Sequence, residues 1–322
     1  MRDKAGRPRG RHGERGHGTK KGWRWKDQLR GRPRQGRAAI CSILYNVGEQ
    51  KRGRGEPMQY LYFTKTLKDL DLQAVAAFCK EIGVDGVDLT VRPGYPVTPD
   101  NAATALPEAV KIFRDAGLIL GLVSAATDLT DPDGKTARAI FDACAKVEAP
   151  AVKTGYFPYK GSFDDDMKVA RIRLAGFARL AERSKVRVVY HTHSGANLGN
   201  NAAGLRLLLQ DCDPHHVGAF VDTGHTAVNG GPFPMELDMV RSWLSMIAIK
   251  DMVWEKTDNA GWQYHVVPAG DGIVRWSEIA RGVKERRFNG TISLHGEYET
   301  KDLDERKTLA KRELEFLKKL LG

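Results

Sequence analysis

Four short runs in the second half of the chain carry the side chains that could do chemistry. Each run is apolar at first and ends in imidazole, carboxylate or ammonium groups, which are costly to bury without a partner. The groups at these ends are His191, His193, Asp222, His225, Lys250, His295 and Glu297. Imidazole and carboxylate together are donors for a divalent metal ion, and a carboxylate can also move a proton. The residue types therefore indicate a metal site combined with acid–base chemistry, provided that the fold brings the four ends together.

The same runs belong to a repeating pattern that starts at Met58. Short segments rich in β-branched and aromatic residues alternate with helical patterns, which is typical of parallel βα units. The predicted strands are 60–65, 86–91, 118–125, 151–157, 186–193, 217–224, 246–252 and 291–298. Eight units in a chain of this size predict a (β/α)8 TIM barrel, a type of α/β fold. A doubly wound open sheet is the alternative, although no GxGxxG turn follows the first strand.

The C-terminal ends of the strands meet at one face of a TIM barrel, where the active sites of this fold are found. Side chains alternate along a strand, so His191 shares a face with His193, and His295 shares one with Glu297. The convergence of several such ends predicts a functional pocket. Residues that serve only stability have no reason to collect there.

Taken alone, each of these residues also has a structural explanation. Asp222 could cap the turn that follows it. His191 could be a hydrogen-bonded core histidine, and Lys250 could form an ion pair with Asp251. His216 precedes the strand over 217–224, so we expect it at the opposite end of the barrel.

Motifs in and after the strands resemble the xylose isomerase-like TIM barrel superfamily, the group of sugar phosphate isomerases and epimerases. The resembling stretches are GVDGVDLTVRPG, YHTHSG, VDTGH, IKD, VPAGDGIVRW and SLHGEY. They follow the order of the predicted units from about Met58 to the end of the chain. The resemblance implies an isomerase or epimerase, or a related lyase, that removes a proton next to a carbonyl. Its substrate would be a keto sugar, sugar phosphate or polyol, and its cofactor Mn²⁺ or Mg²⁺, with Zn²⁺ as an alternative.

The resemblance also implies a set of metal ligands. In the epimerases of the group, the fifth, sixth, seventh and eighth strands supply Glu, Asp, His and Glu. Here Asp222 matches the Asp, and either Glu297 or His295 falls at the last position. His191, in a YHxH variant of the motif, replaces the first Glu, and Ala248 replaces the strand-seven His. Since one carboxylate of the proton-moving pair is lost, epimerisation by two bases is doubtful.

Further roles are implied for residues around these ligands. Glu297 is the expected base, and Lys250 or His193 would return the proton or hold the oxyanion. Burial beside a cation would disfavour the ammonium form of Lys250. The expected substrate-binding residues are His225, Arg92 for a phosphate or carboxylate, and Trp254 and Trp262 with Tyr264 for stacking on sugar carbons.

Two other functions are alternatives to this one. A degenerate barrel could bind a sugar without turning it over, and Ala248 is the main support for that alternative. The same superfamily contains the apurinic endonuclease IV type, which needs a trinuclear zinc cluster with histidines near the second and third strands. The corresponding ends here read LTVRPG and VSAATD, without histidine, which excludes this function.

The net charge of +11 would suggest a nucleic-acid-binding protein if it were spread along the chain. Residues 1–57 carry +12 of it, however, which leaves −1 for residues 58–322. The head is rich in Gly and Arg and lacks periodic apolar residues, so we predict a disordered basic extension. Met58 directly precedes the first strand, which favours an upstream extension, or a misassigned start, without a role in the fold. Nucleic-acid binding through Trp23 and Trp25, or an export signal over 38–48, is less favoured.

The cysteines restrict the cellular environment. Cys41, Cys79, Cys144 and Cys212 form neither a CxxC pair nor a compact disulfide framework, so we expect reduced thiols and a cytoplasmic protein. The chain has no apolar run of the roughly 18 residues that a membrane span requires. We therefore expect no membrane partner, a small-molecule sugar or polyol as ligand, and either a monomer or a homo-oligomer.

Overall fold

A closed barrel of parallel strands forms the centre of residues 57–322, the part of the chain that the computed structural model describes. In chain order its strands are β1 (Gln59–Phe63), β2 (Gly86–Val91), β3 (Ile119–Ala125), β4 (Ala151–Lys153), β5 (Arg187–His191), β6 (Val217–Asp222), β7 (Leu244–Ile249) and β10 (Thr291–Leu294). β1 pairs with both β2 and β10, so the sheet has no free edge. The predicted TIM barrel and its eight strands are confirmed, and the open sheet is excluded.

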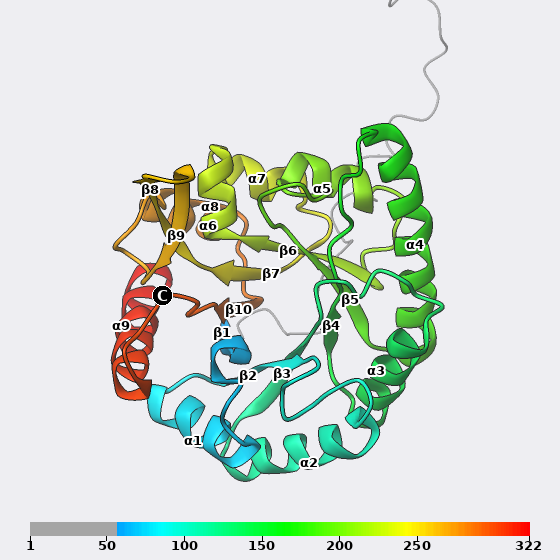
Figure 1. Ribbon diagram of the computed structural model, residues 1–322, viewed down its shortest axis with the longest axis horizontal. Helices are drawn as coiled ribbons and strands as arrows, with labels where there is room; N and C mark the ends of the chain where they lie inside the picture. Colours follow the sequence, from blue (N-terminus) through cyan, green and yellow to red (C-terminus); the bar gives the residue numbers. More distant parts are fainter. Residues whose placement is uncertain (1–56) are drawn as a thin grey trace, which may run out of the picture. The chain divides into compact units, whose positions relative to one another are not determined.

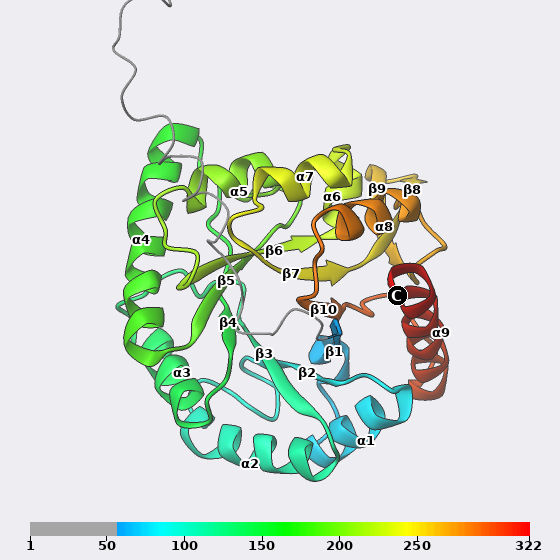
Figure 2. The same ribbon diagram turned by 180° about the vertical axis from the view of Figure 1, so that it is seen from behind.

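Helices form a ring outside the barrel (Figures 1 and 2). They are α1 (Leu72–Ile82), α2 (Ala102–Asp115), α3 (Lys135–Lys146), α4 (Phe163–Ser184), α5 (Ala202–Leu209), α6 (Thr223–Asn229), α7 (Phe233–Met239), α8 (Trp276–Glu285) and α9 (Leu303–Leu321), together with the 3-10 turn η1 (Thr64–Leu67). In α1 the side chain of Asp71 caps the first turn, and Gly83 ends the helix with φ 83°. None of the helices within residues 57–322 is long and apolar enough to cross a membrane.

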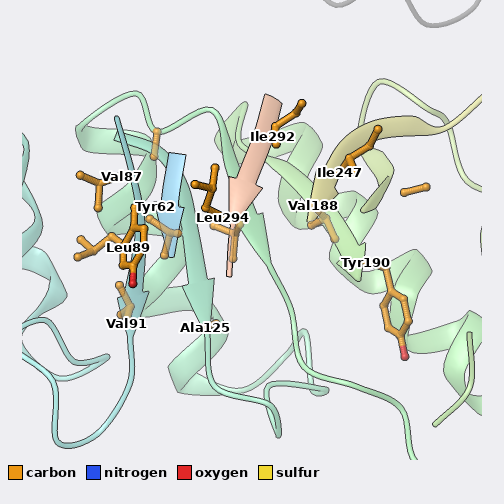
Figure 3. Close-up of a cluster of buried hydrophobic side chains, with 14 of the residues drawn as sticks. Tyr62, Val87, Leu89, Val91, Ala125, Val188, Tyr190, Ile247, Ile292 and Leu294 are labelled. Carbon is orange, nitrogen blue, oxygen red and sulfur yellow. The ribbon is translucent and has the colours of Figure 1, made fainter. Parts of the chain in front are cut away.

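The larger hydrophobic core lies between the strands and the helices. Alternate strand residues contribute to it, such as Val87, Leu89 and Val91 of β2 and Val188 and Tyr190 of β5 (Figure 3). Because side chains alternate, the intervening residues of the same strands face the barrel interior.

A second, smaller core fills the barrel interior. It consists of Leu61, Leu122, Ala151, Val189, Phe220, Met246 and Ala248. Two residues after Leu122, Ala151, Val189, Phe220 and Ala248, the inward positions turn polar: they are Ser124, Lys153, His191, Asp222 and Lys250. In β1 the corresponding residue is Phe63. The barrel therefore has an apolar floor beneath a polar layer at its C-terminal mouth.

The segment after β7 is an antiparallel hairpin of β8 (Asp251–Thr257) and β9 (Gly261–Val267). The strand predicted over 246–252 is thus divided, and Lys250 alone separates β7 from β8. The sequence indicated that this segment carries aromatic residues over the pocket, but not that it is a hairpin. The predicted extension over 1–57, with Trp23, Trp25 and Cys41, lies outside the described residues except for Pro57.

Candidate functional site

His191, Asp222 and His295 converge at the barrel mouth. One ligand atom from each lies within 4.8 Å of the other two, and all three side chains are buried. The imidazole rings of His191 and His295 stack with their centroids 5.4 Å apart. Two imidazoles and one carboxylate at this separation suit a divalent metal ion such as Zn²⁺, Mn²⁺ or a related cation.

Asp222 serves two purposes at the end of β6. Its Oδ1 accepts a hydrogen bond of 2.8 Å from the backbone N–H of His225, which caps α6. Its Oδ2 lies 3.2 Å from Nε2 of His191. The turn cap considered from the sequence is therefore present, and it leaves the second carboxylate oxygen directed at the imidazole.

His191 is held in the form and orientation that a metal ligand needs. Its Nδ1 lies 2.9 Å from the hydroxyl of Tyr156, a contact that fixes the ring. Burial lowers the pKa of His191 well below its ordinary value, and the nearby His295 and Lys153 lower it further. The imidazole is therefore neutral near pH 7, which is the form that binds metals.

His295 is buried, yet neither of its ring nitrogens has a hydrogen-bond partner among the described residues. The nearest carboxylate oxygens are Oδ2 of Asp88 at 3.7 Å and Oε1 of Glu297 at 3.6 Å. Buried polar atoms without partners cost on the order of 1–3 kcal/mol each, so such an arrangement calls for a ligand. A metal ion held by His295 would satisfy one of these nitrogens, and the donor set therefore fits the group that the sequence implied.

Glu297 forms its closest ion pairs with two lysines. Its Oε1 lies 2.8 Å from Nζ of Lys250, and Lys65 forms a second ion pair with the same carboxylate. Burial alone would raise the pKa of Glu297, but Lys250, His295 and Lys65 hold it well below its ordinary value. Glu297 is thus ionised beside a buried ammonium group.

Lys250 does not behave as the sequence led us to expect. Burial alone would lower its pKa, but Glu297 and Asp222 more than offset that effect and raise it. The expectation that its ammonium form is disfavoured is therefore wrong for these surroundings. An ion pair with Asp251 is also wrong, because Asp251 points the other way and accepts hydrogen bonds from five N–H groups, four of the backbone and one of Trp276.

His193 and His225 form a second pair of imidazoles next to His191. Their ring centroids lie 3.9 Å apart. Nδ1 of His225 contacts the hydroxyl of Ser194 at 2.9 Å, and its Nε2 lies 3.3 Å from Nζ of Lys250. Burial lowers the pKa of both histidines. The structure thus brings both residues to the mouth, with His225 in direct contact with the Lys250 ammonium group.

The predicted aromatic residues all lie on the hairpin but differ in their contacts. Tyr264 reaches the mouth, where its hydroxyl accepts a hydrogen bond of 3.2 Å from Ser194. Trp254 packs edge-on against Tyr264, with 5.8 Å between ring centroids. Trp262 is 65% exposed, so it contacts solvent more than the mouth. Arg92, from the loop after β2, donates to the carbonyl of Ala125 and is half-buried.

Sequence reasoning missed three residues at the mouth, of which Asp88 and Lys153 are buried and Tyr156 is half-buried. Asp88 of β2 accepts hydrogen bonds from the hydroxyls of Ser124 and Ser293, at 2.7 and 2.8 Å. Lys153 of β4 and Tyr156 lie beside His191. A signal was available for Asp88 and Lys153, because each is a charged residue inside an otherwise apolar predicted strand.

The fold agrees with comparisons to known proteins. A family model described as xylose isomerase-like TIM barrel matches residues 76–320. A search of curated protein sequences finds no match.

Solved structures with this fold include sugar epimerases and a dehydratase. The 3-keto-D-glucoside 4-epimerase of E. coli superimposes with a TM-score of 0.64 at 15% identity, covering 81% of this chain and 99% of its own. D-psicose 3-epimerase of Clostridium cellulolyticum H10, solved with D-tagatose, superimposes with a TM-score of 0.64 at 14% identity, covering 82% of this chain and 100% of its own. The probable 3-DHS dehydratase of Bacillus anthracis superimposes with a TM-score of 0.64 at 16% identity, covering 81% of this chain and 99% of its own. At these identities the likeness concerns the fold alone.

Proposed function

The chain belongs to the xylose isomerase-like TIM barrel family, and from this premise we propose that it is a divalent-metal-dependent isomerase, epimerase or related lyase. Its substrate would be a keto sugar, sugar phosphate or polyol, from which it removes a proton next to a carbonyl. The observation that carries the proposal is the grouping of His191, Asp222 and His295 beside the ion pair of Lys250 and Glu297. The sugar epimerases among the structures of the same fold support it.

His191, Asp222 and His295 would hold the metal ion. A divalent cation supplies Lewis-acid polarisation of a substrate carbonyl, which acidifies the neighbouring C–H bond. Of the two alternatives for the third ligand, His295 is favoured over Glu297. Its buried ring nitrogens lack hydrogen-bond partners within residues 57–322, while Glu297 is paired with two lysines.

Glu297 is the group that would take the proton. It is ionised, so it can accept a proton from a C–H bond at the mouth. Lys250, charged and 2.8 Å away, would stabilise the developing oxyanion or return a proton. His193 is the second candidate for the return step, and His225 and Arg92 would bind substrate oxygens. Trp254 and Trp262 would line the outer part of the site with Tyr264.

The alternative is a barrel that binds a sugar-like ligand without turning it over. One observation favours it: Ala248, at the position of the strand-seven His, is buried in the apolar floor and offers no ligand atom. The three grouped residues are sufficient for a metal site even so, since catalytic sites often have three protein ligands.

The deciding experiment measures metal content and proton exchange together. Protein purified without chelator is analysed for bound metal and then incubated in D₂O with keto sugars, sugar phosphates and inososes. We expect about one divalent ion per chain and deuterium incorporation next to a carbonyl, both lost after chelation. Glu297→Gln is the matched control, and it should keep the metal and lose the exchange. Metal without exchange in the parent would favour the binding role, and absence of both would refute the proposal.

A further inference from the structure

We propose that Lys153 and Arg92 form a subsite for an anionic group of the substrate, a carboxylate or a phosphate. This inference rests on the proposed function and narrows its substrate class to anionic keto sugars or sugar derivatives. It starts from Lys153, which the sequence did not single out.

The side chain of Lys153 points into the barrel mouth. Ala151, two residues earlier on β4, belongs to the apolar floor, so Lys153 occupies the next inward position. The charged groups that act on its ammonium are all mouth residues: Arg92, Asp88, Lys250 and Glu297. Lys153 is only 2% exposed. Its ammonium group is therefore enclosed at the level of the candidate metal ligands.

No carboxylate within residues 57–322 forms an ion pair with Lys153. Nζ donates a long hydrogen bond of 3.3 Å to the carbonyl of Thr154 and lies 4.2 Å from the ring centroid of Tyr156. These contacts satisfy part of its bonding capacity but bring no counter-charge. Burial, together with the positive charge of Arg92, accordingly lowers the pKa of Lys153 to about 7. A buried cation without an ion-pair partner is costly, and such groups are found at functional sites.

Arg92 supplies a second cation on the same side of the mouth. It follows β2, and its Nε donates to the carbonyl of Ala125 at the end of β3. The guanidinium carbon lies 5.7 Å from the ring centroid of Phe63, and no carboxylate among the described residues pairs with it. β3 also pairs with β4, placing Ser124 beside Lys153. Two cations therefore lie at the ends of the neighbouring strands β3 and β4, and neither forms an ion pair with a carboxylate among the described residues.

A substrate anion resolves this arrangement. A carboxylate or phosphate beside Lys153 and Arg92 provides the missing counter-charge, and the planar guanidinium offers it two parallel N–H donors. Lys65 and Lys250 are not equivalent, because both are already paired with Glu297. Tyr156 connects the subsite to the rest of the mouth, since its ring contacts Lys153 while its hydroxyl contacts His191. The anion would thus sit one side chain away from the candidate metal ligands.

The test uses small anions on the full chain in the presence of a chelator, so that metal plays no part. Inorganic phosphate and glycolate represent the two anion classes, and binding is measured by calorimetry and by the shift in melting temperature at constant ionic strength. We expect one of them to bind saturably with a Kd below about 10 mM, and the stronger of the two identifies the class. Lys153→Met and Arg92→Gln should each weaken this binding at least about tenfold, because each removes one of the two cations.

Lys284→Met, which removes an exposed lysine of α8, is the matched control and should bind like the parent. Lys153→Met removes an uncompensated buried charge, so it should melt at or above the parent temperature; if it does not fold, Arg92→Gln alone decides. Binding of neither anion, or unchanged binding in the variants, would overturn the subsite. Because the assay is done without metal, it distinguishes failure of the subsite from failure of the proposed function, which the metal and deuterium measurements report separately.

Discussion

Nε2 of His191 lies 3.2 Å from Oδ2 of Asp222, and both side chains are almost completely buried. The two residues are not partners across the strands: His191 of β5 pairs with Phe220 of β6, two residues before Asp222. Strands in a closed barrel are staggered, so each step round the ring shifts the register. This stagger brings the imidazole of His191, at the end of β5, against the carboxylate of Asp222, which lies two residues beyond its partner position in β6.

Asp222→Asn should weaken metal binding at least about tenfold without unfolding the protein. Asn keeps the cap to the N–H of His225, because its carbonyl oxygen can accept the same hydrogen bond, but it removes the negative charge. Metal titration by calorimetry, and the melting temperature with and without Mn²⁺, measure the effect. His216→Ala is the control, because His216 directly precedes the first residue of β6 and Asp222 is its last. This variant should bind metal like the parent. Full metal occupancy in Asp222→Asn would make this residue a turn cap only.

The third ligand is identified by comparing His295→Gln with Glu297→Gln. His295→Gln should lose at least about tenfold in metal affinity, while Glu297→Gln should retain the metal and lose proton exchange. His193→Ala is a further control for metal affinity and should bind metal like the parent. Nδ1 of His193 contacts the carbonyl of Ser194 at 2.9 Å, and the residue is not one of the three candidate ligands His191, Asp222 and His295. The assignment fails if Glu297→Gln loses the metal and His295→Gln keeps it.

Lys250→Met should reduce turnover by at least about a hundredfold. Its effect on stability should be smaller than the 3–5 kcal/mol typical of a broken buried ion pair, on the order of 1–3 kcal/mol, because Glu297 retains Lys65. A double-mutant cycle with Glu297→Gln separates the effect on turnover from the effect on stability. Deuterium exchange into the substrate measures the first, and chemical denaturation measures the second. Complete unfolding of Lys250→Met with a stable double variant would mean that the pair is primarily structural.

Glu313→Gln should change how stability depends on pH. Glu313 of α9 accepts hydrogen bonds from the N–H of Ala269 and the hydroxyl of Tyr298, and burial raises its pKa from 4.5 to about 7. Since the folded state keeps a proton that the unfolded state has lost, the contribution of Glu313 to stability is full below pH 4.5 and is lost as the pH rises to about 7. Relative to the parent, the variant should gain about 1–3 kcal/mol in free energy of unfolding between pH 5 and pH 8. Parallel stability curves for the two proteins would contradict this.

The sequence was sufficient for the barrel and for the face that carries the site, because both follow from the alternation of strands, helices and side chains. It could not choose between His295 and Glu297 as the third metal ligand, because that choice depends on the ion pairs that Glu297 forms with Lys65 and Lys250. Lys65 is distant in the sequence and lies in the turn η1. The role proposed for Lys153 was hidden for a similar reason, because only the packed structure reveals that no carboxylate among residues 57–322 forms an ion pair with it.

The single residue between β7 and β8 limits how this barrel can be diversified. TIM barrels ordinarily acquire new substrates by exchanging loops while the strand ends keep the chemistry. Here Lys250 alone separates the strand from the hairpin, and Gly224 packs so closely against it that a Cβ at Gly224 would lie 2.8 Å from the Cβ of Lys250. Asp251 fixes the other side of this junction through its five hydrogen bonds. A hairpin exchanged at this position would therefore act directly on the backbone that holds the Lys250 ammonium group. Under the proposed function, substrate selection and catalysis at this strand would have to change together during evolution or engineering.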